Sequence, residues 1–133
     1  MINGEGDSWL NGVVDISPSE AWAVGLCCIN TFKYGSAIEH WDGTQWSLFP
    51  GPEFGPEEEP EIAGMTAVSA DDIWAVGTMA FVGGGNNQTL FEHWDGTFWT
   101  AQLGPGYGFF KAVSADATDD VWAVGTTLVE TFS

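Results

Sequence analysis

The chain has 133 residues, of which 2 are lysine or arginine and 19 are aspartate or glutamate, and its net charge is −17. Affinity for nucleic acid comes mainly from neutralising phosphates, and a chain whose cations are Lys33 and Lys111 is unsuited to that. Nucleic acid and anionic membranes are therefore excluded as expected partners. The 44% hydrophobic content, with only 16% charged residues, predicts a packed core rather than a disordered chain.

The start of the chain carries no targeting signal. Residues 1–12 lack the basic start and apolar stretch of a secretory signal, and no apolar run approaches the ~20 residues of a membrane span. We expect residues 1–12 to be the end of a preceding linker or blade. The adjacent Cys27 and Cys28 cannot close a long loop by a disulfide, so we interpret them as small strand residues.

The chain is organised as a repeat. The segment Trp-Ala-Val-Gly begins at Trp22, Trp74 and Trp122, which are 52 and 48 residues apart. A partner segment, Glu-His-Trp-Asp-Gly-Thr-x-Trp, follows twice, with its first tryptophan at Trp41 and at Trp94. Such a period is typical of repeat architectures. We divide the chain into repeat 1 (13–64), repeat 2 (65–111) and a truncated repeat 3 (112–133).

Each full repeat predicts four short strands. The first strands are expected at 13–17, 66–69 and 112–114, and each ends in a cluster of turn-forming residues. The Trp-Ala-Val-Gly segment is the second strand, and the third runs into Trp41 or Trp94. Asp-Gly pairs at Asp42 and Asp95 then predict tight hairpins, because glycine and, to a lesser degree, aspartate tolerate positive φ. The fourth strands carry Trp46 and Trp99.

These residues resemble a known family. Trp-Ala-Val-Gly, a variable loop, Glu-His-Trp-Asp, a further tryptophan and a Gly/Pro-rich stretch are similar to a kelch-like β-propeller repeat of bacterial surface propellers. The resemblance covers nearly the whole chain and implies an all-β fold, an incomplete β-propeller of about two and a half four-stranded antiparallel blades. It also implies that the repeated residues have structural roles. These are Trp22, Trp41, Asp42, Gly43, Trp46, Trp74, Trp94, Asp95, Gly96, Trp99 and Trp122.

The number of strands is too small for a closed ring. Ten strands are readable, with two in repeat 3, whereas closed propellers contain about four to eight four-stranded blades. Three explanations remain open: a piece of a longer protein, a protomer that completes a ring by oligomerising, and a short stable stack. We favour the truncated protein and also expect self-association through the exposed terminal blades.

The loop rim is the expected partner-binding surface. The connections between second and third strands and between repeats should emerge on one rim, where they are long and variable, and variable loops on a rigid scaffold often carry function. The stretch 53–61 contains five carboxylates and is expected to be a solvated loop; it has no EF-hand spacing. The candidate contact residues on this rim are Tyr34, Phe54, Glu57, Glu58, Glu59 and Tyr107, with Phe109 and Phe110 either joining them or capping the next blade.

No catalytic, cofactor-binding or metal-binding motif is present in the sequence. His40 and His93 recur beside Glu39 and Glu92 in each repeat, which favours a packing role over catalysis. Asp116, Asp119 and Asp120 are interpreted as a turn with a three-residue insertion. We interpret Trp41, Trp46, Trp94 and Trp99 as core residues, the alternative being a glycan-binding platform.

The functional prediction is a binding or scaffold module without enzymatic activity. It would present acidic and aromatic loops to a protein or glycan partner, at the cell surface or outside the cell, and would use no cofactor. Two alternatives stay open. The chain is part of a propeller glycosidase, lyase or oxidase whose catalytic residues lie in other blades, or it is a lectin-like protomer that closes a ring by oligomerisation.

Overall fold

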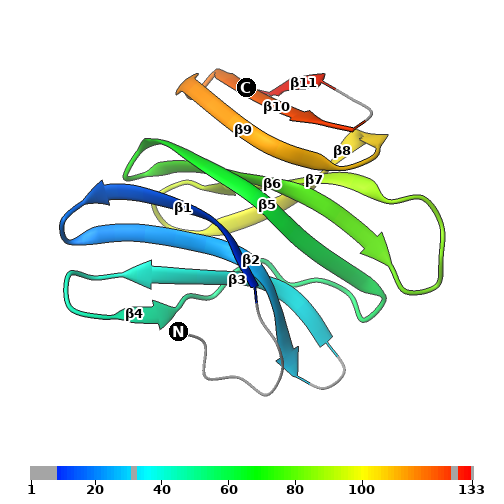
Figure 1. Cartoon of the computed structure of the whole chain (residues 1–133), viewed down its shortest axis with the longest axis horizontal. Coiled ribbons are helices and arrows are strands. Elements are labelled where there is room, and N and C mark those ends of the chain that lie inside the picture. Colours follow the sequence, from blue (N-terminus) through cyan, green and yellow to red (C-terminus); the bar gives the residue numbers. More distant parts are fainter. Residues whose placement is uncertain (1–8, 31–32, 127–128, 133) are drawn as a thin grey trace.

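The computed structural model describes residues 9–30, 33–126 and 129–132, and it confirms the predicted all-β class. The described residues form strands and no helix, and the strands pair into three antiparallel sheets, none of which closes into a barrel. In Figure 1 the three sheets follow one another in chain order, from the blue and cyan N-terminal sheet through the green and yellow central sheet to the orange C-terminal sheet.

The N-terminal and central sheets have four strands each, and three strands form the C-terminal sheet. The N-terminal sheet contains β1 (Trp9–Ser17), β2 (Glu20–Asn30), β3 (Lys33–Trp41) and β4 (Trp46–Leu48). The central sheet contains β5 (Glu58–Ser69), β6 (Asp72–Phe81), β7 (Gln88–Trp94) and β8 (Trp99–Tyr107). The C-terminal sheet contains β9 (Phe110–Ala117), β10 (Asp120–Gly125) and β11 (Val129–Phe132). Strands are paired in chain order within every sheet, as expected for successive hairpins.

Several strands are longer than the sequence predicts. β1 begins at Trp9 rather than at residue 13, and β5 begins at Glu58, so residues 58–64 are paired rather than part of a loop. Repeat 3 has a third strand, β11, which was not predicted. Residues 1–8 of the expected preceding linker lie outside the described residues.

The first hairpin of repeat 3 contains no insertion, which corrects the interpretation of Asp116, Asp119 and Asp120. Ala117 pairs with Asp120 across two turn residues, just as Ser69 pairs with Asp72 in the central sheet. Asp116 therefore lies within β9 and Asp120 begins β10. The segment Ala-Val-Ser-Ala-Asp occurs at 112–116 and at 67–71, but the two copies do not occupy equivalent positions. Trp122 pairs with Ser114, whereas Trp74 pairs with Thr66, so Ser114 is the structural equivalent of Thr66.

The glycine of each Trp-Ala-Val-Gly segment lies against a bulge of the neighbouring first strand. A Cβ atom on Gly25, Gly77 or Gly125 would lie 1.7, 1.9 or 1.6 Å from the backbone oxygen of Trp9, Glu61 or Phe109. A register shift interrupts the pairing beside each glycine, at Leu10/Gly12, Ile62/Gly64 and Val124/Gly125. A glycine is required here because the bulged backbone occupies the space of a side chain.

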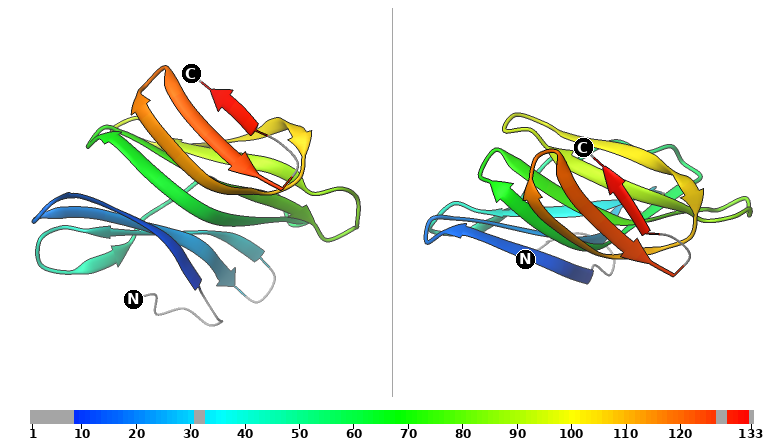
Figure 2. Two further views of the ribbon diagram at one scale, coloured as in Figure 1. Left: turned by 45° about the horizontal axis from the view of Figure 1, so that its top comes forward. Right: turned by 90° about the horizontal axis from the view of Figure 1, so that it is seen from above.

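Each sheet presents two faces that we name by their position in the stack. The forward face looks toward the next sheet in the chain, and the rear face looks toward the preceding one. In β2, Trp22 and Val24 belong to the forward face, whereas Ala21 and Ala23 belong to the rear face, because neighbouring side chains in a strand alternate. The forward face of the N-terminal sheet packs on the rear face of the central sheet, and the same relation joins the central and C-terminal sheets (Figure 2).

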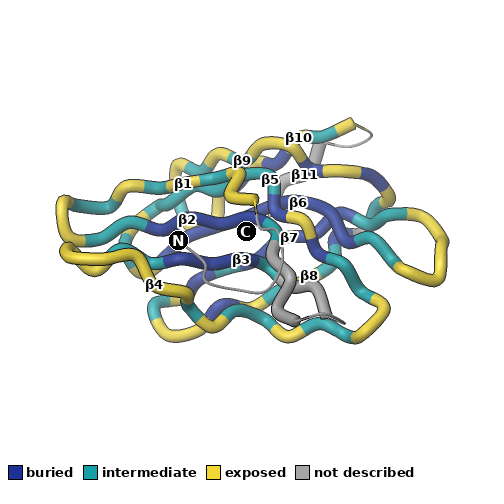
Figure 3. The backbone as a smooth tube through the Cα atoms, turned by 60° about the horizontal axis from the view of Figure 1, so that its bottom comes forward, coloured by how far each residue is buried: buried dark blue, intermediate teal, exposed yellow. Residues whose placement is uncertain are grey.

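Two cores hold the stack together. The larger core joins Trp22, Val24 and Ile38 to Ile73, Ala75, Leu90, Trp94 and Trp99 of the central sheet. The smaller core joins Val76 to Phe110 and Ala123 of the C-terminal sheet. Because β6 is covered on both faces, its residues from Asp72 to Met79 are all buried, and the buried positions concentrate in the middle strands in Figure 3. Strands β1, β5 and β9 also contact one another in this order across the sheets.

Small residues allow these first strands to approach closely. A Cβ atom on Gly12 would lie 3.2 Å from the Gly64 Cα, and one on Gly64 would lie 3.9 Å from the Ala112 Cα. The three residues occupy the same register position, opposite Val24, Val76 and Val124 respectively. The side chain of Asn11 donates a hydrogen bond of 2.9 Å to the Ile62 carbonyl at the same junction.

Candidate functional site

The long connections of the central sheet emerge at one end, as predicted. Glu58 pairs with Phe81 and Gln88 pairs with Tyr107, so the start of β5, the end of β6, the start of β7 and the end of β8 meet there. The hairpin end lies opposite, where Ser69 pairs with Asp72. Loops 82–87 and 108–109 therefore belong to one rim.

This rim carries a shallow depression that we call the rim groove. It has a volume of about 330 Å³ and is lined by Gly85, Asn86, Asn87, Tyr107, Gly108 and Phe109. The Gly108 amide donates to the Asn87 carbonyl at 2.9 Å, which ties the two loops together. Tyr107 is 60% exposed and Phe109 is 43% exposed, so two aromatic rings lie beside two amide side chains. The groove offers apolar surface and hydrogen-bonding groups without a formal charge.

The structure separates the predicted contact residues. Tyr107 lines the rim groove, whereas Phe54 packs on the larger core. Glu58 and Glu59 are paired residues of β5, opposite Phe81 and Ala80. Tyr34, like the cysteine pair, lies outside the residues whose side chains the structure describes. Of the five candidates whose side chains are described, Tyr107 therefore lines the rim groove and the other four do not.

The acidic stretch is partly structured. The Glu57 carbonyl accepts a hydrogen bond of 2.9 Å from the Val82 amide, and the Glu58 carboxylate accepts one of 3.0 Å from the Gly55 amide. Phe54 and Glu58 line a cavity of about 170 Å³ together with Glu53 and with Met79, Leu90, Ala101, Gln102 and Leu103. Glu53 and Glu57 are exposed, as expected of a solvated segment.

Phe109 and Phe110 have different environments. Phe109 is exposed on the rim groove, whereas Phe110 is buried in the smaller core. Asn86 and Asn87 were not predicted as site residues, because the Gly-Asn run has the composition of a plain flexible loop. The pairing of Gln88 with Tyr107 and the hydrogen bond from the Gly108 amide to the Asn87 carbonyl bring these amides beside the aromatic rings.

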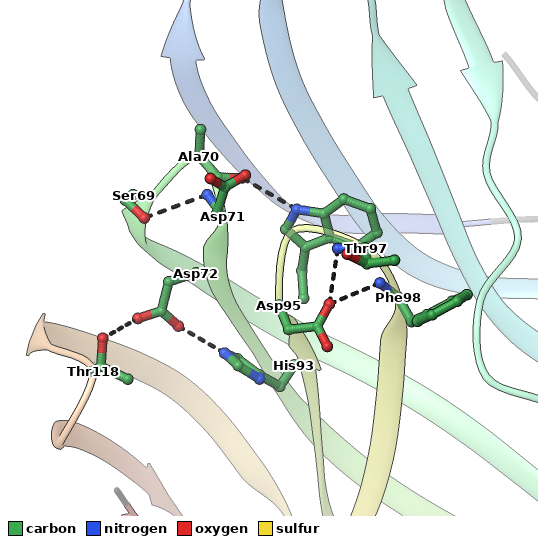
Figure 4. A network of polar contacts seen from close by, with 10 residues as sticks. Ser69, Ala70, Asp71, Asp72, His93, Asp95, Thr97, Phe98 and Thr118 are labelled. Carbon is green, nitrogen blue, oxygen red and sulfur yellow. Dashed lines mark hydrogen bonds and ion pairs between the residues drawn. The ribbon is translucent and has the colours of Figure 1, made fainter.

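His93 belongs to a polar chain that links the central and C-terminal sheets (Figure 4). Its Nε2 atom lies 2.7 Å from one carboxylate oxygen of Asp72, and the Thr118 hydroxyl donates to the other. In this order the carboxylate stands between the histidine and the hydroxyl. Through the Asp72 carboxylate this chain joins the first hairpin of the C-terminal sheet to the central sheet.

Glu92 is a buried carboxyl at the interface between the N-terminal and central sheets. The Ser36 hydroxyl of β3 donates a hydrogen bond to it across this interface. Burial raises the pKa of Glu92 to about 7, and the Ser36 hydrogen bond opposes part of that rise. The side chain lies among apolar neighbours on the rear face of the central sheet, beside Ala75 and Ala101.

The turns after Trp41 and Trp94 are four-residue loops rather than two-residue hairpins. The Asp42 carboxylate accepts hydrogen bonds from the Thr44 and Gln45 amides at 2.8 and 2.9 Å and one from the Thr44 hydroxyl at 2.8 Å. These bonds, from Gln45 first, lower the pKa of Asp42 to about 2. Gly43 adopts the predicted positive φ of 99°, but Asp42 does not adopt one: among the described residues every positive φ belongs to a glycine.

The repeated tryptophans have two kinds of environment. Trp94 and Trp99 are buried, which agrees with the predicted core role, and the Trp94 indole donates to the Ala70 carbonyl at 3.1 Å. Trp41 and Trp46 occupy the equivalent positions on the rear face of the N-terminal sheet, where no described sheet covers them and Trp46 is exposed. Trp46 therefore departs from the predicted core role, whereas Trp41 is half-buried.

Within the described ranges, no three His, Cys, Asp or Glu side chains gather closely enough to hold a metal ion. The part of the chain that the structure describes also has no helix able to cross a membrane. A search with protein-family models found no match to this chain, and neither the curated proteins nor the solved structures that were compared with it contain a match.

Proposed function

We propose that the chain is a section of a β-propeller that acts outside the cell as a non-catalytic binding module and holds a glycan in the rim groove. The observation that carries this proposal is the position of Tyr107 and Phe109, exposed beside Asn86 and Asn87 on one rim. Aromatic rings cover the apolar faces of sugars, and amide side chains pair with their hydroxyl groups.

The propeller architecture is supported by the arrangement of the first strands. β1 lies beside β5, and β5 lies beside β9, with close backbone approaches at Gly12, Gly64 and Ala112. Sheets that share a crowded first strand and repeat the same face-to-face contact are the building principle of a propeller. In such a fold the groove belongs to the loop rim, where binding residues commonly lie.

A non-catalytic role is supported by the contacts of the groups that most resemble catalytic ones. His93 and Asp72 are engaged in the chain that ends at Thr118, and Glu92 is engaged by Ser36 inside a sheet interface. Asp72 and Glu92 each make a contact between two sheets. None of them lines the rim groove.

Titration of the protein against a panel of neutral oligosaccharides tests the proposal. We expect binding by the wild type and a loss of about tenfold or more in affinity for Tyr107→Ala, because a central aromatic contact is commonly worth more than 1 kcal/mol. Phe98→Ala is the matched control, since Phe98 is an exposed aromatic residue in the opposite hairpin. Equal affinity of Tyr107→Ala and wild type, or hydrolysis of the oligosaccharide by the wild type, would contradict the proposal.

A basic protein segment is the second candidate ligand, and the net charge of −17 favours it. Exposed Glu53 and Glu57 lie on the segment that precedes β5, on the same rim as Val82. Binding of this kind weakens steeply as salt rises, whereas stacking of a neutral sugar on Tyr107 does not. The salt dependence of any observed binding therefore distinguishes the two ligands.

A further inference from the structure

The two end faces of the stack are the rear face of the N-terminal sheet and the forward face of the C-terminal sheet. Their tryptophans match the two sides of the contact between the N-terminal and central sheets. In the larger core, the Trp22 ring inserts next to Trp94 and Trp99, at centroid distances of 4.9 and 5.6 Å. Trp22 lies on a forward face, and Trp94 and Trp99 lie on a rear face. We call Trp22 the knob and the tryptophan pair the socket of this interface.

A second socket lies on the rear face of the N-terminal sheet. Trp41 and Trp46 pair across β3 and β4 just as Trp94 and Trp99 pair across β7 and β8. The ring centroids are 5.9 Å apart in both pairs, with interplanar angles of 48° and 38°. A hollow of about 310 Å³ adjoins this second socket and is lined by Asp15, Ser17, Pro18, Ala21, Trp41 and Trp46.

A second knob lies on the forward face of the C-terminal sheet. Trp122 has the position of Trp22 in its repeat, but it is 51% exposed whereas Trp22 is 2% exposed. Val124 is likewise 44% exposed, whereas its counterpart Val24 is fully buried. No sheet of the described part of the chain covers this face.

Two exposed apolar side chains also lie on the same face as the second socket. Val13 and Leu48, both exposed, flank Ala23 and Glu39, which are both buried, in one row across β1 to β4. The equivalent row of the central sheet contains Met65, Ala75, Glu92 and Ala101, and it is covered by the N-terminal sheet. The row order is therefore the same on the rear faces of the two sheets.

From this match we infer that a second copy of the chain docks head to tail, with Trp122 of each copy inserted between Trp41 and Trp46 of the other. Two copies place six sheets in one closed ring, within the range of about four to eight that propellers use. The closure rests on the propeller curvature put forward above but not on glycan binding at the rim groove.

The area that such a ring buries is sufficient for a stable dimer. One sheet face of four strands about 4.8 Å apart and five residues of about 3.3 Å covers roughly 300 Å². Two contacts bury two four-stranded rear faces and two three-stranded forward faces, about 1,100 Å² in total, which exceeds the roughly 1,000 Å² expected of a biological interface. A single head-to-tail contact buries half of that, so closure favours the dimer over an open chain.

Charge opposes this association. Each copy carries a net charge of −17, and the repulsion between two copies decreases as salt shortens the screening length. We therefore expect dimerisation to strengthen with sodium chloride, in contrast to binding of a basic partner.

Sedimentation equilibrium on the full chain, at protein concentrations up to about 1 mM in high salt, tests the inference. The expected result is a dimer for the wild type. The dissociation constant of the dimer should be at least about 30-fold higher for Trp122→Glu and for Trp46→Glu, because a tryptophan buried in an interface is a frequent hot spot. Val13→Glu is a second rear-face variant for the case in which Trp46→Glu does not fold. Val82→Glu is the control, because Val82 is exposed on the rim loop and lies on neither end face.

Mixing the variants identifies the geometry. A mixture of Trp122→Glu and Val13→Glu contains one intact forward face and one intact rear face, so it should form a dimer that is weaker than wild type but stronger than either variant alone. A wild type that stays monomeric, a dimer sensitive to only one of the two faces, or growth into longer chains would overturn the inference. Glycan titration of the same samples reports separately on the rim groove.

Discussion

The Ser36 hydroxyl of β3 donates a hydrogen bond to the Glu92 carboxyl of β7, and this is a direct polar contact between the N-terminal and central sheets. Around it the interface is built from aromatic and aliphatic side chains of the larger core. A carboxyl in such a place favours its neutral form, because burial penalises the charge. The stability of this interface is therefore expected to depend on pH.

The first prediction concerns this pH dependence. The pKa of Glu92 is raised from 4.5 to about 7 in the folded chain, so the folded state holds a proton that the unfolded state releases between these values. Stability should fall as pH rises through this window, by up to about 3 kcal/mol from this group, and the loss is complete above pH 7. Urea unfolding of wild type and Glu92→Gln across the window measures it.

Glu92→Gln should remove this contribution, because glutamine keeps the shape of the neutral acid. The difference between variant and wild type should grow in favour of the variant as pH rises from 4.5 to 7. Glu61→Gln is the matched control at an exposed position of β5. Parallel stability profiles for wild type and Glu92→Gln would show that Glu92 does not titrate in this way.

The second prediction concerns the glycine of the Trp-Ala-Val-Gly segment. Gly77→Ala should destabilise the fold by at least about 3 kcal/mol, since the added Cβ would lie 1.9 Å from the Glu61 oxygen and the backbone must move. Gly83→Ala provides the comparison: its Cβ would meet only the end of the Glu57 side chain at 4.0 Å. Thermal unfolding of both variants decides whether the bulge requires glycine, and equal melting temperatures would mean that it does not.

The third prediction concerns the Asp42 turn. The pKa of Asp42 is about 2 because the Gln45 amide and the Thr44 hydroxyl and amide donate to its carboxylate. Thr44→Val removes the hydroxyl donor, so the Asp42 pKa should rise toward 3.8, as followed by carboxyl chemical shifts in an NMR titration. The stabilisation by this carboxylate is present above pH 3.8 and is lost as pH falls through 2.

Asp95 supplies the internal reference for this measurement. The pKa of Asp95 is lowered mainly because the backbone amides of Phe98 and Thr97 donate hydrogen bonds to its carboxylate. Thr97→Val should therefore leave the Asp95 pKa nearly unchanged. A similar rise for Asp95 in Thr97→Val and for Asp42 in Thr44→Val would contradict the assignment of the Thr44 hydroxyl as a donor.

The fourth prediction concerns the tether between the central and C-terminal sheets. Thr118→Val removes the hydroxyl that donates to Asp72 and should cost about 1 kcal/mol, which is typical of one hydrogen bond. Hydrogen exchange should accelerate in β9 and β10 more than in β2 and β3, because the tether holds the C-terminal sheet to the central sheet and does not involve the N-terminal sheet. Thr100→Val, at an exposed position of β8, is the control. Uniform acceleration across all sheets would argue against a local tether.

The repeat and the strand content were predictable because they depend on local patterns. Alternation in Trp-Ala-Val-Gly places Trp22 and Val24 on one face whatever the tertiary contacts are. The positive φ of Gly43 and Gly96 was also predictable, since an Asp-Gly turn requires it. The loop rim of the central sheet follows from the order of strands alone.

What could not be predicted depends on partners from elsewhere in the chain. The requirement for Gly77 comes from the backbone of Glu61, and the strand character of Glu58 and Glu59 comes from pairing with Phe81 and Ala80. The charged residues and prolines of the stretch 53–61 suggested a loop, because composition carries no information about which strand a segment pairs with. Trp41 and Trp94 have the same local sequence, and only the position of their sheet in the stack makes one more exposed than the other.

The pairing of one forward face with one rear face makes each sheet an interchangeable unit. The chain already stacks two different rear faces on two different forward faces, with Trp22 and Val24 in one contact and Trp74 and Val76 in the equivalent position of the other. Duplication or loss of a whole repeat of about 50 residues would bring together surfaces of matching type. Growth of such proteins by gene duplication therefore requires no new type of interface, because an added sheet would use the same contact between a forward face and a rear face.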